Sequence, residues 1–108
     1  MTEFVAERQL LCSLKGSDVR KEITIGISAP FSVNQDMVSF DIGSGLFACR
    51  VEVVGLDEIS RDVYGMDSFQ AIHLATDTVE SWLRQLRKKY DIYFPNGDAY
   101  FDNVVVTE

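Results

Sequence analysis

The chain has 108 residues, of which 46% are hydrophobic and 25% are charged, and this composition is typical of one soluble globular domain. The formal net charge of −7 argues against nucleic-acid binding, because a protein that binds phosphates needs a basic face. No apolar run reaches the ~20 residues that span a bilayer, and the acidic start of the chain lacks the apolar segment of a signal peptide. We therefore expect a cytoplasmic protein that does not bind membranes.

The first part of the chain predicts a β-hairpin. Apolar residues alternate with polar ones over residues 4–14 and again over residues 19–29, and a turn-forming stretch at 15–18 joins the two runs. The side chains that this alternation places on the inner face are Phe4, Ala6, Leu10, Cys12, Leu14, Val19, Ile23, Ile25 and Ile27. Pro30 ends the second strand, because proline has no N–H to donate to a neighbouring strand.

A second hairpin is predicted over residues 37–54. Residues 37–42 alternate weakly and residues 46–54 alternate strongly, and the glycines between them permit a sharp reversal. The inward positions of the stronger strand are Phe47, Cys49, Val51 and Val53. We expect residues 55–64 to form a loop that is acidic at Asp57, Glu58 and Asp62.

Residues 67–89 predict the long helix of the chain. Asp67 has the side chain of an N-cap, and Gln70, three residues later, completes a capping-box-like pair in which its amide reaches back to the cap. The apolar stripe at helical spacing consists of Phe69, Ile72, Ala75, Val79, Trp82, Leu83, Leu86 and Tyr90, with Ala71 beside it. A helix of this length matches the expected strands and would cover one face of an antiparallel sheet.

The segment after the helix is rich in aromatic residues, namely Tyr90, Tyr93, Phe94, Tyr100 and Phe101. The turn signal at 95–97 predicts a short terminal hairpin, or a strand that continues through residues 104–106. The aromatic side chains would form either a satellite core under the helix end or an interface, because aromatic residues are enriched in binding hot spots. A strand over residues 100–106 would also pair with the sheet edge of a second copy and give a homodimer.

Residue types with catalytic or metal-binding chemistry form no recognisable pattern. His73 is the one histidine and the two cysteines, Cys12 and Cys49, are far apart, so we expect no metal site and no cofactor. Both cysteines are expected to be free thiols on inner faces, and their positions leave open whether they are neighbours. Ser44 lies between two glycines but lacks the strand-to-helix turn of a nucleophile elbow. We expect no catalytic residue and no enzymatic activity.

The run Tyr64-Gly65-Met66-Asp67-Ser68-Phe69-Gln70-Ala71-Ile72-His73-Leu74-Ala75, together with Ala6-Glu7-Arg8 near the start and Cys49 in a later strand, resembles a family of small bacterial proteins of unknown function. The resemblance covers about the first 90 residues, and its helix motif is G-x-D-S-F-Q-A-L-x-L-A, with Ile72 in place of a leucine. It implies the same fold and a bacterial cytoplasmic origin, and it implies no catalytic residue.

We therefore expect the α+β class: an antiparallel sheet of four to five strands, built from two hairpins, with one long helix on one face and a short terminal strand or hairpin, all within a single domain of residues 1–108. The expected function is a non-enzymatic protein-interaction module, immunity-like or regulatory, whose acidic surface attracts a basic protein partner. The alternatives are a small-molecule binder or enzyme with a site between the helix start and the 55–64 loop, and a homo-oligomeric structural protein. The residues expected to take part in interactions are Asp57, Glu58, Arg61, Asp62, Tyr64, Tyr93, Phe94, Tyr100 and Phe101.

Overall fold

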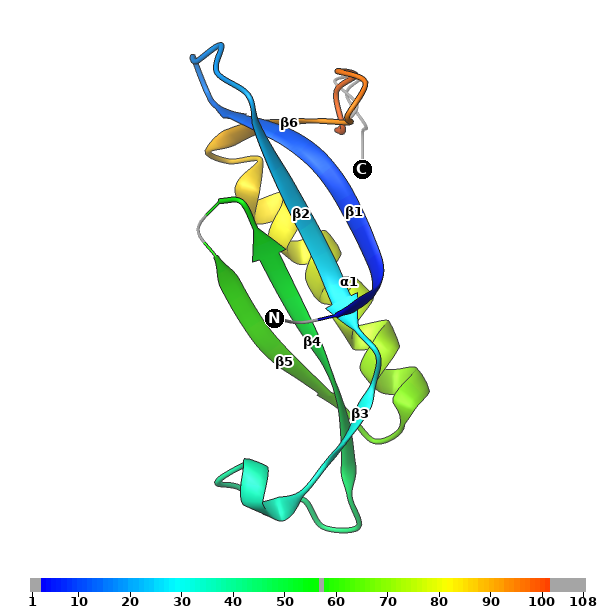
Figure 1. The fold of residues 1–108 in the computed structure, drawn as a ribbon. Helices are drawn as coiled ribbons and strands as arrows, with labels where there is room; N and C mark the ends of the chain where they lie inside the picture. The colour runs from blue at the N-terminus through cyan, green and yellow to red at the C-terminus, as the bar shows by residue number, and fades with distance from the viewer. Residues whose placement is uncertain (1–2, 57, 102–108) are drawn as a thin grey trace, which may run out of the picture.

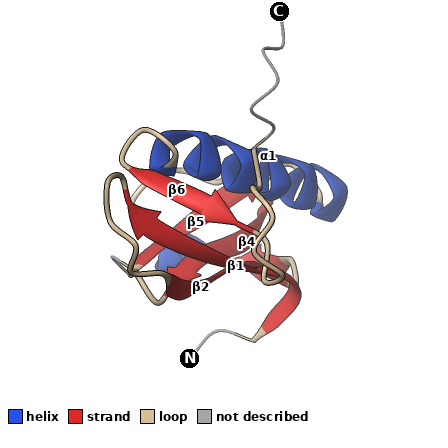
Figure 2. Ribbon diagram, turned by 90° about the horizontal axis from the view of Figure 1, so that it is seen from above, coloured by secondary structure: helices blue, strands red, loops and turns tan. Residues whose placement is uncertain are grey.

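The computed structural model describes residues 3–56 and 58–101, where six antiparallel strands form one sheet and a long helix crosses one of its faces (Figure 1 and Figure 2). The elements are β1 (Phe4–Leu14), β2 (Lys21–Ser28), β3 (Phe31–Val33), the 3-10 turn η1 (Gln35–Met37), β4 (Leu46–Val54), β5 (Ile59–Gly65), α1 (Ser68–Leu86) and β6 (Tyr90–Tyr93). The α+β class, with its single long helix followed by a terminal strand, is confirmed.

Strands β1 and β2 form the first predicted hairpin. Their register places Leu10 opposite Ile23 and Arg8 opposite Ile25, with an irregularity between Phe4 and Ala6. The terminal strand β6 pairs with the other edge of β1 over residues 90–93, which makes β6 one border of the sheet.

Strand β4 is the centre of the other half of the sheet. One edge of β4 pairs first with β3, over residues 46–48, and then with β2, over residues 51–54. Its opposite edge pairs with β5 over residues 47–53. The second hairpin is therefore β4–β5, and it lies later in the chain than the sequence predicted.

The predicted strand at 37–42 is wrong, because Met37 is the last residue of η1 and residues 38–42 follow it as an irregular loop. The side chain of Gln35 takes over the hydrogen bonds that a neighbouring strand would have made. Its Nε2 donates to the carbonyl of Phe40 at 2.6 Å, and its Oε1 accepts from the backbone N–H of Ile42 at 3.2 Å. A side-chain amide that binds both kinds of backbone group removes the need for a strand partner here.

The predicted loop at 55–64 is also wrong, because most of it is strand β5. Residues opposite each other in an antiparallel pair share a face, so the register with β4 places Ile59, Arg61 and Val63 on the helix side. Ser60, Asp62 and Tyr64 lie on the other side of the sheet. Arg61 is a charged residue between Ile59 and Val63, where an alternating strand pattern requires an apolar one. The sequence pattern therefore did not predict a strand here.

The helix begins at the predicted cap. The Asp67 carboxylate accepts from the backbone N–H of Gln70 at 2.7 Å, as expected. The Gln70 side chain was predicted to bind the backbone N–H of Asp67. It binds one residue earlier instead, where its Oε1 accepts from the N–H of Met66 at 2.6 Å. The helix ends at Leu86, and residues 87–89 form a tight turn rather than a further helical turn.

The start of the helix departs from the predicted stripe, whereas the later stripe residues, from Ala75 to Leu86, pack against the core as predicted. Ala71, Ala75 and Leu83 are buried, whereas Phe69 is 85% exposed and Ile72 is 36% exposed. Gly65 explains the difference, because a Cβ at this position would lie 2.4 Å from the backbone nitrogen of Ala71. The close approach of β5 and the first helical turn leaves room only for small side chains between them, so Phe69 points outward.

The core lies between the sheet and the helix in two adjoining groups. One group contains Leu10, Cys12, Ile23, Ile25, Val53, Leu83 and Ile92. The other contains Ile27, Cys49, Val51, Ala71 and Ala75, and Val79 and Trp82 contact both groups. Ala6, Leu14 and Val19 are exposed rather than buried. Ala6 lies on the part of β1 that β6 does not cover, Leu14 is the last residue of β1, and Val19 lies in the β1–β2 loop.

Candidate functional site

The residues expected to form a site before the helix are split between the two faces of the sheet. Asp62 lies on the face away from the helix and accepts two hydrogen bonds from Arg50, Nε to Oδ1 at 2.8 Å and Nη2 to Oδ2 at 3.3 Å. This pairing raises the pKa of the Arg50 guanidinium further above its ordinary value. Tyr64, on the same face, packs edge-to-face with Phe40 at 5.5 Å between ring centroids. Glu58 is exposed, and Asp57 lies outside the described residues.

The aromatic residues after the helix form a packed cluster. The rings of Phe94 and Tyr100 are 5.1 Å apart, and those of Tyr100 and Phe101 are 5.0 Å apart. Arg20 lies over the ring of Tyr93 at 3.9 Å, and the Arg8 guanidinium donates to the Tyr100 hydroxyl. Tyr90, Tyr100 and Phe101 pack against the core, which agrees with a satellite core, and Phe94 remains 40% exposed.

The terminal hairpin is confirmed within the described part of the chain. The N–H of Tyr100 donates to the carbonyl of Ile92 at 2.9 Å, and the N–H of Phe94 donates to that of Asp98 at 2.7 Å. The alternative strand through residues 104–106 lies outside the described residues. The homodimer expected through residues 100–106 therefore stays a prediction.

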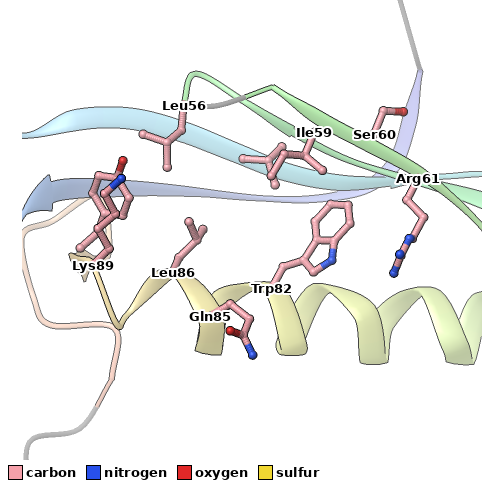
Figure 3. A pocket seen from close by; sticks show the side chains of 10 residues that line it. Leu56, Ile59, Ser60, Arg61, Trp82, Gln85, Leu86 and Lys89 are labelled. Atoms are coloured by element: carbon pink, nitrogen blue, oxygen red, sulfur yellow. The ribbon is translucent and has the colours of Figure 1, made fainter.

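A groove of about 510 Å³ opens between the β4–β5 hairpin and the last two turns of α1 (Figure 3). Its walls include Leu56 and Arg61 on the sheet side and Trp82, Leu86 and Lys89 on the helix side. Of the predicted site residues that the structure describes, Arg61 is the one that lines it. The groove lies at the helix end and not at the helix start, where Gly65 brings β5 against the helix.

An exposed apolar patch surrounds the helix start. Met66 is 68% exposed, Phe69 85% and Ile72 36%, and we call these three residues the Phe69 patch. Phe69 and Ile72 are three positions apart, so their side chains are neighbours on one side of the helix. The apolar residues of the patch were visible in the run G-M-D-S-F-Q-A-I of residues 65–72. Their spacing alone could not show whether each side chain points outward or is buried.

Ionisable side chains on the outer side of the first helical turns are mainly acidic. Asp67 is exposed at the cap, and Asp77 lies one turn beyond His73 with its carboxylate 3.5 Å from Nε2 of His73. Glu80 pairs with Arg8 at 3.4 Å. The basic residues of the helix region, Arg84, Arg87, Lys88 and Lys89, lie at the opposite end.

Residues 3–56 and 58–101 contain no group of three His, Cys, Asp or Glu side chains close enough to hold a metal ion. Within the same ranges no helix has the length and hydropathy needed to cross a membrane. Cys12 and Cys49 are buried and free, and β2 separates their strands.

A protein-family model described as a domain of unknown function (DUF6968) matches residues 6–96. The matched range begins in β1 and ends in the turn after β6, so it includes all the strands and the helix. No curated protein and no solved structure matches the chain. The resemblance found in the sequence to a family of unknown function is confirmed.

Proposed function

Because the chain belongs to the DUF6968 family, whose description assigns no activity, we propose a function from its surface: it is a non-enzymatic module that binds a basic protein partner through the Phe69 patch. The exposure of Phe69 carries this proposal. Full burial of a phenylalanine side chain contributes about 1.5–3 kcal/mol, and here most of that side chain remains in water. Aromatic side chains of this kind are the typical anchors of protein interfaces.

The charges around the patch favour a basic partner. Asp67 and Asp77 lie on either side of the apolar residues along the helix, and the helical cations are at the far end. The net charge of −7 adds a long-range attraction for cationic surfaces. An apolar centre with an acidic rim matches a hydrophobic pocket bordered by lysine or arginine residues.

A partner with these properties is consistent with a regulatory or immunity-like role, in which a small acidic protein covers a basic surface of another protein. The proposed mechanism is insertion of Phe69 into the partner's pocket, followed by ion pairs at the rim. Gly65 and the capped first turn hold the Phe69 backbone in place, so the anchor loses little freedom on binding.

The test compares the wild-type protein with Phe69→Ser and, as a matched control, Val19→Ser. Val19 is 77% exposed in the β1–β2 loop, at the end of the molecule away from the helix start (Figure 1). Each protein is used to capture partners from a lysate of the source cells at low salt. A captured protein is identified by mass spectrometry, purified and titrated against all three by calorimetry.

We expect the wild-type protein and Val19→Ser to bind the purified partner equally, and Phe69→Ser to bind at least about 30-fold more weakly, as for a hot-spot anchor. Affinity should also fall as salt is raised, because the rim is charged. Equal affinities of the two variants, or binding that salt leaves unchanged, would contradict the proposal. A wild-type protein that dimerises in analytical ultracentrifugation while Phe69→Ser stays monomeric would show that the patch covers itself instead.

A further inference from the structure

The groove beside Trp82 is a second feature of the surface, independent of the Phe69 patch. We propose that this groove binds a small apolar carboxylate, with the carboxylate held by Arg61 and the apolar body held against Trp82 and Leu86. Its volume of about 510 Å³ falls within the roughly 300–1,000 Å³ range of small-molecule sites.

The groove follows from how the helix meets strand β5. At the start of α1 the backbones touch, because Gly65, Ala71 and Ala75 have small side chains or none. At the other end the facing residues, Ile59 and Trp82, have large side chains. Both line the groove between the strand and the helix, and Ile59 remains 46% exposed. The space between helix and edge strand therefore widens toward the β4–β5 turn, and most of its lining residues belong to β4, β5 and α1.

The charge in the groove is the opposite of the charge of the chain. Among the described residues, its lining contains two cations, Arg61 and Lys89, and no carboxylate, although acidic residues outnumber basic ones by 17 to 10 in the sequence. Arg61 makes no ion pair with any residue in 3–56 or 58–101, whereas Arg8, Lys15 and Arg50 each have an acidic partner there. Arg61, a cation at the edge of an apolar groove with no ion-pair partner within 3–56 and 58–101, complements an anionic group on a ligand.

The arrangement of these residues indicates which end of the ligand lies where. In Figure 3, Arg61 extends from β5 toward the helix beside Trp82, and Leu86 and Leu56 lie further along the groove toward Lys89. The guanidinium is a planar fork that binds a carboxylate through two parallel hydrogen bonds. With the carboxylate on Arg61, the apolar body of the ligand would lie over the indole ring and Leu86.

The chain offers a direct reporter, because Trp82 is its one tryptophan. The test titrates the full-length protein with decanoate, decan-1-ol and decylammonium, all below their solubility or micelle limits, and follows Trp82 fluorescence. The three probes share the same apolar chain and differ in head-group charge. The variants are Arg61→Gln and Arg84→Gln, which remove the same charge; Arg84 is exposed on the helix and does not line the groove.

We expect saturable binding of decanoate to the wild-type protein, at least about fivefold tighter than that of decan-1-ol or decylammonium, as for a partly exposed ion pair. Arg61→Gln should remove this preference and leave decan-1-ol binding unchanged, and Arg84→Gln should behave as wild type. The proposal is overturned if decanoate gives no saturable signal, if decan-1-ol binds as tightly as decanoate, or if the two variants lose affinity equally. Circular dichroism of each variant confirms that the fold is intact.

Discussion

Replacement of Gly65 by alanine tests the contact that orients the helix. The new Cβ would lie 2.4 Å from the nitrogen of Ala71 and 2.8 Å from the carbonyl carbon of Gln70, where ordinary contacts are 3.4–4 Å. Both neighbours are backbone atoms, so the first turn of α1 must move by about an ångström, taking Ala71 and Ala75 from their packing. Overpacking of this kind costs about 1–3 kcal/mol, and the loss of glycine flexibility in the unfolded chain returns about 0.4–1 kcal/mol.

We therefore expect Gly65→Ala to lower the free energy of unfolding by about 1–2 kcal/mol, measured by urea denaturation. For a domain of this size the midpoint of thermal unfolding should fall by roughly 10 °C. Gly26→Ala is the matched control, because the three atoms nearest to its Cβ all belong to the side-chain ring of Phe4, a partly exposed residue at the start of β1, and not to the backbone. Equal costs for the two variants, or a Gly65→Ala protein as stable as wild type, would refute the account of why Phe69 points outward.

Three further changes test other parts of the structure. Asp67→Ala should lower the free energy of urea unfolding by about 1 kcal/mol, because the N–H of Gln70 loses its acceptor. Phe69→Ser should change the same free energy by less than about 0.5 kcal/mol, because the side chain is exposed. Burial raises the pKa of the Cys12 and Cys49 thiols, so the unfolded chain releases these protons at lower pH than the folded one. Stability should therefore be constant below the ordinary thiol pKa of about 8.5 and fall above it, by up to about 1.4 kcal/mol per pH unit for each thiol, and a double cysteine-to-alanine variant should lose this dependence.

The strands and helix that carry strong local signals were predictable. The β1–β2 alternation, the β4 run and the Asp67 cap each follow from a short pattern whose physical cause lies within the same residues. Strand β5 was not predicted because an edge strand needs only a few apolar residues to pack against the helix. Arg61 also occupies a position where the alternating pattern requires an apolar residue. The strand expected at 37–42 failed because Gln35 binds that segment through its side chain.

The surfaces were less predictable than the fold. Phe69 and Ala71 both stand at helical spacing from later apolar residues, so periodicity alone allows either to face the sheet. Which of the two faces the sheet depends on the close approach of Gly65, which belongs to β5. The sequence pattern of the helix contains no information on that contact. The groove also depends on how two separate elements pack. In the sequence Trp82 has the spacing of a core residue, but α1 diverges from β5 at this point and one side of the indole ring lines the groove.

The position of β4 has a consequence for how the molecule opens. Over residues 51–53 β4 pairs with β2 on one edge and β5 on the other, so successive amides donate alternately to the two neighbours. The β4 protons bonded to β2 exchange with solvent only when the two halves of the sheet separate, which amounts to unfolding of the whole domain, whereas those bonded to β5 exchange when that edge strand detaches. In β5, which pairs only with β4 among the described strands, every second amide points to the open edge and exchanges from the native state. Adjacent strands of one sheet would thus report two different free energies in the same hydrogen-exchange experiment.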